Sequence, residues 1–430
     1  MTNPLRISRD WVYALGFGAF GLILRFWNLD SPKGKIFDEV YYAANAQSLL
    51  ENGVEIDSKT GLAQFIVHPP TGKWLIAIGI KLFGYNEFGW RSAAALVGSL
   101  SIILMYFTAK KLFNNRFLSV LAASLISMDG LHLVHSRVAL LDIFLLFFIQ
   151  IAVLAFLHQK YWISTLALGL ATSVKWSGLY VLIALAFLVL VTDFRKHRFL
   201  GSDHPFRELV RRNLLFRFLQ FAIFPTFVYV ASWFGWFATN NGWDRNFSSN
   251  PLLSFWHYHV EILNFHTELR DPHPYSANPW SWLIQGRPTS FFYETPKNCG
   301  GINCSQEILA LGTPVLWWAA TIALLVTIGI WVSRRDWQAE ILLIVIGASY
   351  LPWFAIQERT MFSFYAVAFE PFILLTLVFV VSKIVKTQRK VAAILVAIVL
   401  ANFLYFLPIF LGLPLTYNSW HDRMWLPSWI

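Results

Sequence analysis

The chain has 430 residues, of which 57% are hydrophobic, 17% aromatic and only 13% charged, with a mean hydropathy of +0.53. A soluble domain carries roughly a quarter charged residues, so this composition excludes a soluble globular protein. Apolar segments of about 20 residues recur along most of the chain, which indicates membrane-spanning helices rather than the short alternating segments of a β-barrel. We therefore predict an all-α polytopic membrane protein.

The formal net charge of +10 does not indicate a nucleic-acid partner. Lys and Arg are concentrated in short segments between apolar runs, at 110–116, 195–212, 334–335 and 383–390. When spans are counted from the N-terminus, these segments all fall on the same side, which is typical of the cytoplasmic loops of membrane proteins. This distribution predicts a cytoplasmic N-terminus and membrane lipid as the surrounding partner.

The apolar runs predict about eleven spans, an odd number that puts the C-terminus outside. In chain order they are 11–27, 89–109, 117–133, 139–157, 161–174, 177–192, 214–238, 308–332, 338–355, 361–382 and 391–411. The first run lacks a small-residue cleavage site, so we interpret it as a retained span rather than a signal peptide. The polar sequence SVKWSG separates 161–174 from 177–192, and these two short pieces could form one broken unit.

Two long segments, 28–88 and 240–306, are predicted to lie outside. The first contains DEVYYAANAQSLLENG, which reads as a short helix closed by Asn-Gly, and HPPTGKWLIAIGIKLFG, which suits a helix lying in the membrane interface. The second is rich in Trp, Pro, Asn and His.

Asp38 and Glu39 follow the first span on the predicted outer helix. They could simply be acids at a solvated helix start, where the helix dipole favours them. However, Arg25 lies near the outer end of the first span and Arg91 at the start of the second. Ionisable residues in spans are costly and indicate function or a partner, so these four charges predict a site at the outer interface.

Further charged residues stand at the ends of later spans. Arg137 and Asp142 flank one outer end, where a polar contact between spans is the simpler interpretation. Lys175, in SVKWSGLY, suits a phosphate group, although a lysine there can also extend to the interface for solvation alone. Arg359 could hold an anionic head group.

Histidines offer weaker signals. His68 precedes Pro69-Pro70 and could be a ligand or a base, but a lone histidine is more often structural. The run HYHVEILNFH contains His257, His259, Glu261 and His266, yet it lacks the HExxH spacing of a zinc site, so we expect no metal. Cys299 and Cys304 lie in an outer segment of an otherwise cysteine-free chain, which predicts a disulfide.

Several stretches together resemble the protein O-mannosyltransferase family in its bacterial form. They are RFWNLDSPKGKIFDEVYYA, HPPTGKWLIAIG, SRVALLD, SVKWSGLY and RTMFSFYAVAFEP, and the likeness extends over most of the chain. The resemblance implies a GT-C glycosyltransferase architecture, a polyprenyl-phosphate-mannose donor, and Ser/Thr acceptors on exported proteins. It also implies that Asp38 is the catalytic base, that Glu39, Arg25 and Arg91 are needed for activity, and that Lys175 lies near the donor phosphate.

The chain departs from the eukaryotic members of that family in its second outer segment. Residues 240–306 are too few to hold the β-trefoil MIR domain found there, so we expect one GT-C transmembrane domain over 1–430. The sequence FSFYAVAFEP also differs from the His-rich eukaryotic version.

These residues predict an inverting transfer without a cofactor. A carboxylate within reach of an acceptor hydroxyl can remove its proton during attack, while cations stabilise the phosphate that leaves. Adjacent residues on a helix project about 100° apart, so we expect Asp38 to face the acceptor and Glu39 an arginine. The site would face outward from a bacterial plasma membrane.

Two alternatives remain open on the residues alone. A related transferase could act on a glycolipid or polysaccharide, and a non-enzymatic polytopic protein could transport lipid. A transporter is expected to carry polar residues near the membrane midplane, often in two related halves. Here the charges gather at one interface, and no halves match.

Overall fold

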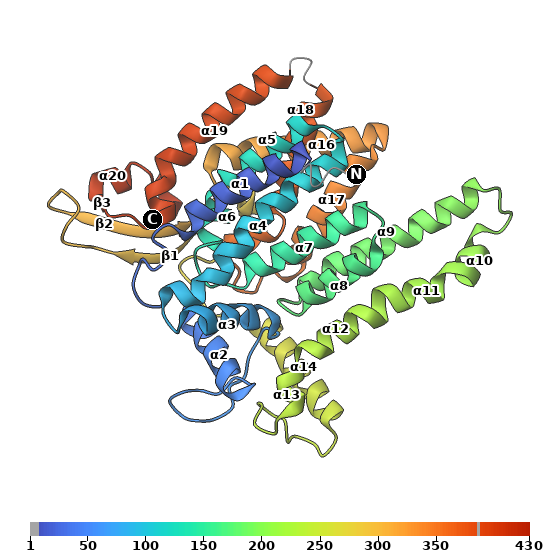
Figure 1. Ribbon diagram of the computed structural model, residues 1–430, viewed down its shortest axis with the longest axis horizontal. Helices are drawn as coiled ribbons and strands as arrows, with labels where there is room; N and C mark the ends of the chain where they lie inside the picture. The colour runs from blue at the N-terminus through green and yellow to red at the C-terminus, as the bar shows by residue number, and fades with distance from the viewer. Residues whose placement is uncertain (1–7, 385–387) are drawn as a thin grey trace, which may run out of the picture.

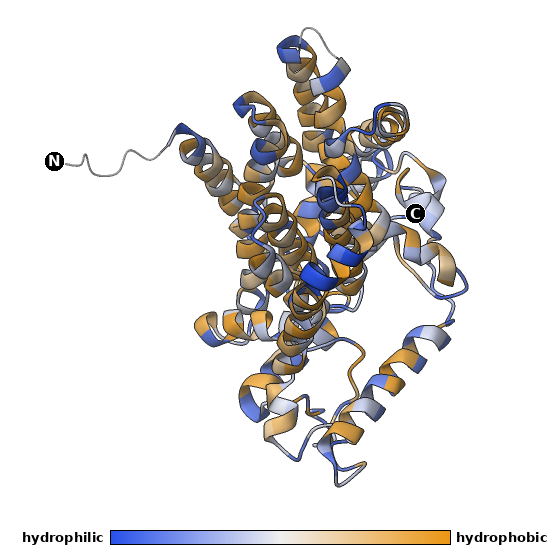
Figure 2. Ribbon diagram, turned by 90° about the vertical axis from the view of Figure 1, so that its right-hand side faces the viewer, coloured by the Kyte–Doolittle hydropathy of each residue, from blue (hydrophilic) through white to orange (hydrophobic). Residues whose placement is uncertain are grey.

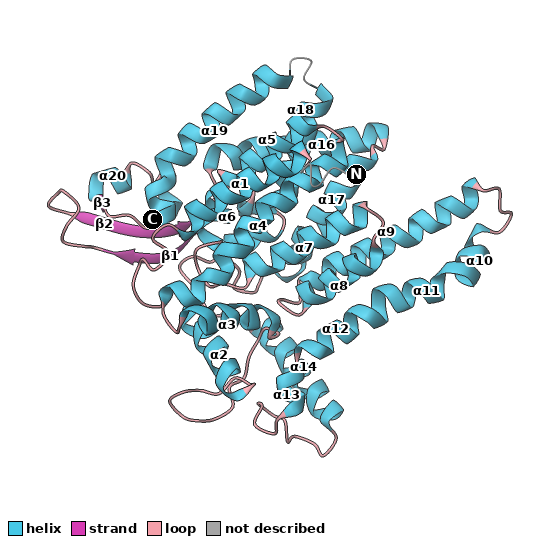
Figure 3. Ribbon diagram, in the orientation of Figure 1, coloured by secondary structure: helices cyan, strands magenta, loops and turns pink. Residues whose placement is uncertain are grey.

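The computed structural model describes residues 8–384 and 388–430, and helices dominate it (Figure 3). The longer helices are α1 (Arg9–Phe26), α4 (Glu87–Phe113), α5 (Arg116–Ser127), α7 (Asp142–Leu157), α8 (Tyr161–Thr172), α9 (Gly178–Phe199), α16 (Pro314–Arg334), α17 (Trp337–Tyr350), α18 (Glu370–Ile384) and α19 (Gln388–Leu411). Residues 205–232 form one continuous helical segment, composed of α10 (Pro205–Leu209), η1 (Val210–Leu214), α11 (Leu215–Phe218), η2 (Leu219–Ile223) and α12 (Phe224–Ser232).

Shorter elements connect these helices. They are α2 (Glu39–Asn52), α3 (Thr71–Phe83), α6 (Gly130–His135), α13 (Phe234–Ala238), α14 (Pro251–Glu268), α15 (Pro279–Trp282), α20 (Tyr417–His421), the 3-10 helices η3 (Leu351–Ile356), η4 (Ser363–Ala368) and η5 (Pro427–Trp429), and the strands β1 (Thr289–Glu294), β2 (Cys304–Ala310) and β3 (Leu415–Thr416). The strands form one antiparallel sheet in the order β1-β2-β3, with Thr289 opposite Ala310 and Cys304 opposite Thr416.

Within residues 8–384 and 388–430, six helical segments are long and apolar enough to cross a membrane, which confirms the predicted multi-pass architecture. They are Glu87–Phe113, Gly178–Phe199, Pro205–Ser232, Pro314–Arg334, Trp337–Ile356 and Gln388–Leu411, and each overlaps a predicted span. The other five predicted spans contain shorter or more charged helices, so the total of eleven stays a prediction. Two boundaries differ: predicted span 308–332 begins inside strand β2, and 361–382 begins as the 3-10 helix η4.

Helix α7 lies in the interior of the helical bundle. Its 16 residues are apolar apart from Asp142 and Gln150, and most are buried on every side, as expected for a helix without a polar face. Helices α1 and α4 approach closely where α1 carries glycine. A Cβ atom added at Gly21 would lie 2.4 Å from the end of the Ile102 side chain, which would have to shift to make room. The long helices consist mostly of hydrophobic residues, and hydrophilic residues are concentrated at helix ends and in connections (Figure 2).

The basic connections gather at one end of the bundle. Lys383 pairs with Asp336 at 2.8 Å, Arg195 with Glu340 at 3.6 Å, and the Gln338 amide with the Leu112 carbonyl at 2.5 Å. Residues 385–387 of the basic segment 383–390 lie outside the described residues. Helices α2, α3 and α14, the sheet and the C-terminus lie at the opposite end (Figure 1).

That opposite end has its own small core, which joins the two predicted outer segments. Val54 and Ile66 from the first segment pack with Trp236, Tyr258 and Ile262 from the region leading into and through α14. In the hairpin between β1 and β2, the sulfurs of Cys299 and Cys304 are bonded. The two outer segments are therefore one packed unit rather than separate loops.

Candidate active site

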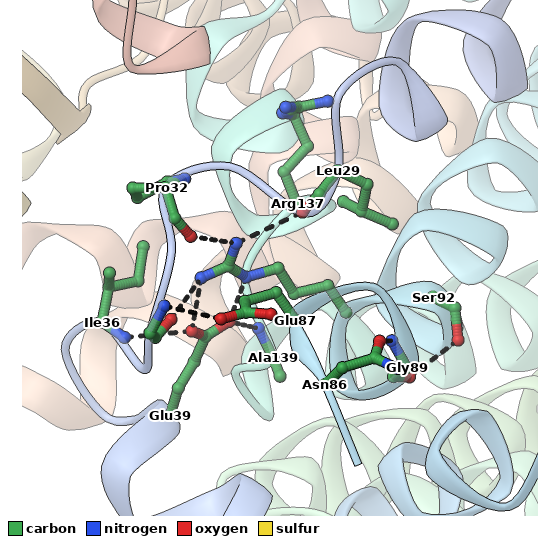
Figure 4. A network of polar contacts seen from close by, with 12 residues as sticks. Leu29, Pro32, Ile36, Glu39, Asn86, Glu87, Gly89, Ser92, Arg137 and Ala139 are labelled. Atoms are coloured by element: carbon green, nitrogen blue, oxygen red, sulfur yellow. Dashed lines mark hydrogen bonds and ion pairs between the residues drawn. The ribbon is translucent and has the colours of Figure 1, made fainter. Parts of the chain in front are cut away.

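Glu39 lies in a saturated buried network (Figure 4). Its two carboxylate oxygens accept hydrogen bonds from Arg91 Nε at 2.8 Å and Arg91 Nη2 at 2.9 Å. They also accept from the backbone N–H groups of Ile36 at 3.0 Å and Ala139 at 2.9 Å. Both side chains of the pair are 0% exposed. The expected orientation of Glu39 toward an arginine is therefore observed.

Arg91 uses all of its donors inside the protein. Besides Glu39, its guanidinium donates to the carbonyl oxygens of Leu29 at 3.2 Å, Pro32 at 2.9 Å and Gly34 at 3.1 Å. Five contacts match the five N–H groups of a guanidinium. Arg91 thus fixes the loop that leads from α1 to α2 and has no donor left for a ligand.

Arg137 and Arg25 are also engaged internally. Arg137 donates to the carbonyl oxygens of residues 24, 25, 27 and 28 at 2.7–3.2 Å, which satisfies the free carbonyls at the end of α1. Arg25 is fully buried, and its Nη2 lies 2.7 Å from His132 Nδ1. Neither arginine, nor Glu39 or Arg91, lines the cavities described next.

Asp38 lines a cavity of about 590 Å³ at the end of the bundle that carries α2 and α14. The residue before it, Phe37, has a φ of 47°, an uncommon value for a non-glycine residue, and its ring stacks on Phe291 at 4.5 Å. This turn ends just before α2, where Asp38 is the capping position. The other residues around the cavity include Tyr42, Lys73, Asp271, His273 and several aromatic side chains.

A second cavity of about 300 Å³ is mainly apolar. Its polar residues include Asp142, at the start of α7, and Lys175, between α8 and α9. Lys175 Nζ lies 3.0 and 2.8 Å from the two Asp142 oxygens, so the cation is already paired. Apolar side chains such as Leu145, Ile149 and Trp353 line the rest of this cavity.

The two cavities share five lining residues, which shows that they adjoin. The shared residues are His68, Lys175, His266, Arg359 and Tyr365. The structure therefore brings together Asp38, His68, Asp142, Lys175 and Arg359 among the sequence-predicted site residues. Glu39, Arg91 and Arg137 lie outside the cavities, because their polar atoms fix the loop and the end of α1. Arg25 also lies outside them, where it contacts the Gly21 carbonyl oxygen of its own helix and His132 of α6.

The electrostatics of the Asp38 carboxyl group suit proton transfer. Burial raises its pKa to about 6, the nearby Lys175 ammonium opposes that rise, and the Asp142 carboxylate adds to it. Tyr42 hydrogen-bonds the carboxylate and also opposes the rise. A carboxylate with a pKa near 6 is ionised at neutral pH and is a stronger base than an ordinary aspartate.

The two histidine rings that line both cavities, those of His68 and His266, are uncharged at neutral pH. Burial lowers the pKa of His68 well below its usual value, and burial together with the Arg359 charge lowers the pKa of His266 to about 4. The rings of these two histidines stack at 5.2 Å. In the sequence, His266 stands out only as a weak candidate for a metal ligand. Its contact with Arg359 has no signal in the sequence.

The histidines of HYHVEILNFH have separate partners. His257 contacts Asp244 at 3.1 Å, His259 contacts the Tyr229 hydroxyl at 2.7 Å, and His266 contacts Arg359. Over residues 8–384 and 388–430, no group of three His, Cys, Asp or Glu side chains is arranged to hold a metal ion.

Comparison with known proteins identifies the family. Residues 16–235 match the model of dolichyl-phosphate-mannose-protein mannosyltransferases, and residues 251–429 match that of the C-terminal four-transmembrane region of protein O-mannosyltransferases. The chain is 33% identical to the polyprenol-phosphate-mannose–protein mannosyltransferase of Mycolicibacterium smegmatis, over 99% of this chain and 94% of that protein. The chain belongs to the protein O-mannosyltransferase family. A protein of the same name from Corynebacterium glutamicum is 29% identical, over 95% of this chain and 92% of that protein.

Solved structures agree with the predicted GT-C architecture. A chain of the Saccharomyces cerevisiae protein O-mannosyltransferase Pmt1-Pmt2 complex, bound to the sugar donor, superimposes with a TM-score of 0.82 at 15% identity, covering 99% of this chain and 93% of that one. ArnT from Cupriavidus metallidurans, bound to undecaprenyl phosphate, gives 0.59 at 19% identity, covering 94% and 65%. At these identities the likeness concerns the fold alone. It confirms the predicted GT-C fold for this chain.

Proposed function

We propose that this protein transfers mannose from polyprenyl-phosphate-mannose to Ser/Thr hydroxyls of exported proteins, with inversion at the sugar carbon. The relatives bear the name of that activity. One observation carries the mechanistic part: a basic carboxylate, Asp38, and two cations, Lys175 and Arg359, line one cavity of about 590 Å³. A base opposite a phosphate-binding pair is the arrangement that a direct displacement requires.

In the proposed reaction, Asp38 accepts the proton of the acceptor hydroxyl. The hydroxyl oxygen forms a bond to C1 of mannose while the bond from C1 to the phosphate oxygen breaks. Both electrons of that bond leave with polyprenyl phosphate, whose additional negative charge Lys175 and Arg359 stabilise. Beyond the donor and the acceptor, the reaction needs no redox step and no further co-substrate.

The two cavities suggest where each substrate lies. The apolar cavity of about 300 Å³ suits the first prenyl units of the donor lipid, and its shared wall with the larger cavity suits the phosphate. The larger cavity, lined by Asp38 and aromatic side chains, suits the mannose and the acceptor peptide. The positive charge of Arg359 should stabilise the phosphate more than that of Lys175, because Lys175 is already paired with the Asp142 carboxylate.

Glu39, Arg25, Arg91 and Arg137 are positioning residues in this proposal. Glu39, Arg91 and Arg137 hold the loop 28–39 and the end of α1 through buried contacts, so that Asp38 stays at the cavity. Arg25 joins α1 to His132 of α6. The need for Glu39, Arg25 and Arg91 that the family resemblance implies would then follow from geometry rather than from contact with substrate.

The activity is tested with membranes containing the protein and radiolabelled polyprenyl-phosphate-mannose. We expect label in protein, sensitive to chemical release from Ser and Thr, and a much lower rate of labelling in membranes with Asp38→Asn. Label that entered only a glycolipid or polysaccharide would instead identify a lipid-sugar transferase. Donor that crossed the membrane without transfer would identify a transporter. Either result would overturn the proposal.

We also propose that the cavities face outward from a bacterial plasma membrane and that the basic end faces the cytoplasm. The test uses single cysteines in a variant lacking Cys299 and Cys304. Ser58→Cys, in the first outer segment, should react with an impermeant reagent on intact cells, whereas Asp203→Cys should react only after lysis. The opposite labelling pattern would invert the topology.

A further inference from the structure

Helix α14 carries a histidine pattern that the proposed reaction does not use. His259 and His266 are seven residues apart, and seven residues make almost two full turns, so both lie on one face of the helix. His259 lines neither cavity and contacts the Tyr229 hydroxyl. His266 lines both cavities.

His266 connects two other chain segments through its two ring nitrogens. Nε2 lies 2.8 Å from the Val67 carbonyl oxygen, which only accepts, so Nε2 carries the proton. Nδ1 is then a free acceptor, and Arg359 Nη2 donates to it at 3.2 Å. The neutral ring therefore fixes the Arg359 guanidinium relative to the segment that contains His68.

Arg359 needs such a contact because it has little else to orient it. Among the described residues it forms no ion pair, and its Nε is buried without a hydrogen-bond partner. The nearest aromatic face, Trp353, lies 6.0 Å from the guanidinium carbon. Lys175 differs, since both oxygens of Asp142 hold it. His266 is thus the one described side chain that donates to or accepts from Arg359.

The same face of α14 also contacts the segment that contains Lys175, through the Tyr229 hydroxyl. Trp176 Nε1 donates to the Tyr229 hydroxyl at 2.9 Å, and that hydroxyl lies 2.7 Å from His259 Nε2. His259 Nδ1 lies 2.7 Å from the Phe255 carbonyl of its own helix, which fixes its proton on Nδ1. One face of α14 therefore contacts the residue beside Lys175 as well as Arg359.

We propose that α14 is the positioning helix of the donor-phosphate site, and that His266 is a positioning residue that holds Arg359 toward the phosphate. This inference rests on the proposed function, because it assumes that Arg359 meets the phosphate of the lipid donor. His266 touches no reacting atom and acts through Arg359.

The experiment compares His266→Ala, His266→Asn and His266→Gln in the full-length protein. The amide oxygen of Asn occupies nearly the place of Nδ1 and can still accept from Arg359, whereas Gln replaces the more distant Nε2. For each variant, the KM for polyprenyl-phosphate-mannose, the KM for an acceptor peptide and kcat are measured, together with binding of polyprenyl phosphate alone. His257→Asn is the matched control, because His257 lies on the same helix but lines neither cavity.

We expect His266→Ala and His266→Gln to raise the donor KM and weaken polyprenyl phosphate binding about tenfold, the worth of a hydrogen bond to a charged group. The acceptor KM should stay unchanged, and His266→Asn should recover most of the loss. Adding His266→Ala to Arg359→Ala should cost nothing further, since the histidine acts through the arginine.

Two results would overturn the inference: an unchanged donor KM in His266→Ala, or full additivity with Arg359→Ala. A fall in thermal stability without a change in phosphate binding would make His266 a folding residue and would also overturn it. These outcomes differ from failure of the proposed function, in which the wild-type protein transfers no mannose to protein. Polyprenyl phosphate binding remains measurable even then.

Discussion

Asp38 and Glu39 are neighbours in sequence but belong to two regions with opposite hydrogen-bonding states. In the anchored loop, which comprises residues 28–37, Glu39, Arg91 and Arg137, the donors and acceptors of Glu39 and Arg91 are paired within the protein. In the cavity wall, formed by Asp38, His68, Lys175, His266 and Arg359, polar atoms remain available.

The difference separates residues that hold the fold from residues that meet a ligand. A saturated buried arginine cannot bind substrate without giving up a partner that has no access to water, which is costly. A partly free arginine beside a cavity carries no such cost. Arg91 and Arg359 carry the same charge, but all donors of Arg91 are used within the protein, whereas Arg359 lines both cavities and keeps an unused donor.

Asp38→Asn should have the largest effect on transfer. Asparagine keeps the size of the side chain and removes its basicity, so donor binding should persist while kcat falls by roughly 10² to 10⁴, the usual worth of general-base catalysis. Single-turnover transfer to a Ser/Thr peptide and a separate donor-binding measurement check both parts. Near-normal transfer would remove Asp38 from the role of base.

Glu39→Gln should act on the other region, through stability. The carboxylate accepts four hydrogen bonds, two at each oxygen, so either orientation of the glutamine amide sets an NH₂ group against donors. Breaking a buried ion pair costs about 3 to 5 kcal/mol, and the yield of folded protein should fall with activity.

The control for this change is Glu87, at the start of α4, which contacts the same loop. Glu87 accepts from the Gly34 N–H at 2.7 Å in an exposed position, so Glu87→Gln should leave the unfolding temperature nearly unchanged. Thermal unfolding in detergent compares the two variants. If Glu39→Gln unfolded at the wild-type temperature yet lost transfer, Glu39 would belong to the cavity wall after all.

Much of the fold followed from the sequence, because apolar length and clustered Lys and Arg are local signals. The predicted spans overlap all six long helices, and the break at SVKWSG lies between α8 and α9. The 3-10 helix η4 and the strand β2 were missed, since each adjoins an apolar helix and extends its hydrophobic run.

The site was less accessible to prediction. Asp38 and the orientation of Glu39 could be inferred from neighbouring residues and family resemblance. The pairing of Lys175 with Asp142, and of Arg359 with His266, joins positions 33 and 93 residues apart, and only tertiary packing decides such contacts. Arg91 and Arg359 carry the same charge, so their different hydrogen-bonding states had no signature in the sequence.

The pH dependence of transfer should reveal how charges in the cavity wall act on Asp38. A base works when deprotonated, so transfer should fall about tenfold per pH unit below the Asp38 pKa of about 6 and level off above it. Lys175 lowers this pKa and Asp142 raises it. Lys175→Met should therefore move the midpoint to higher pH, and Asp142→Asn should move it to lower pH.

Alanine variants of the two cations test donor binding. Lys175→Ala should raise the KM for the donor more than the KM for the acceptor, although less than Arg359→Ala does, because Asp142 already neutralises Lys175. Equal midpoints in all variants would show that another group governs the acid side of the profile. A donor KM unaffected by Lys175→Ala would leave this lysine a purely structural role.

The smallest effect on transfer is expected at the hairpin, which belongs to neither region. Cys299 and Cys304 are separated by 5 residues and line neither cavity. Closing so short a loop restricts the unfolded chain only slightly, so Cys299→Ser with Cys304→Ser should lower the free energy of unfolding by about 2 kcal/mol at most. Transfer at a temperature well below unfolding should stay within about twofold of wild type, as for substitutions away from a site.

Reduction of the wild-type protein should reproduce both results, because it breaks the same bond without changing the sequence. A marked loss of transfer in the folded double variant would mean that the hairpin reaches the acceptor, and the cavity wall would then extend beyond α14 to the sheet.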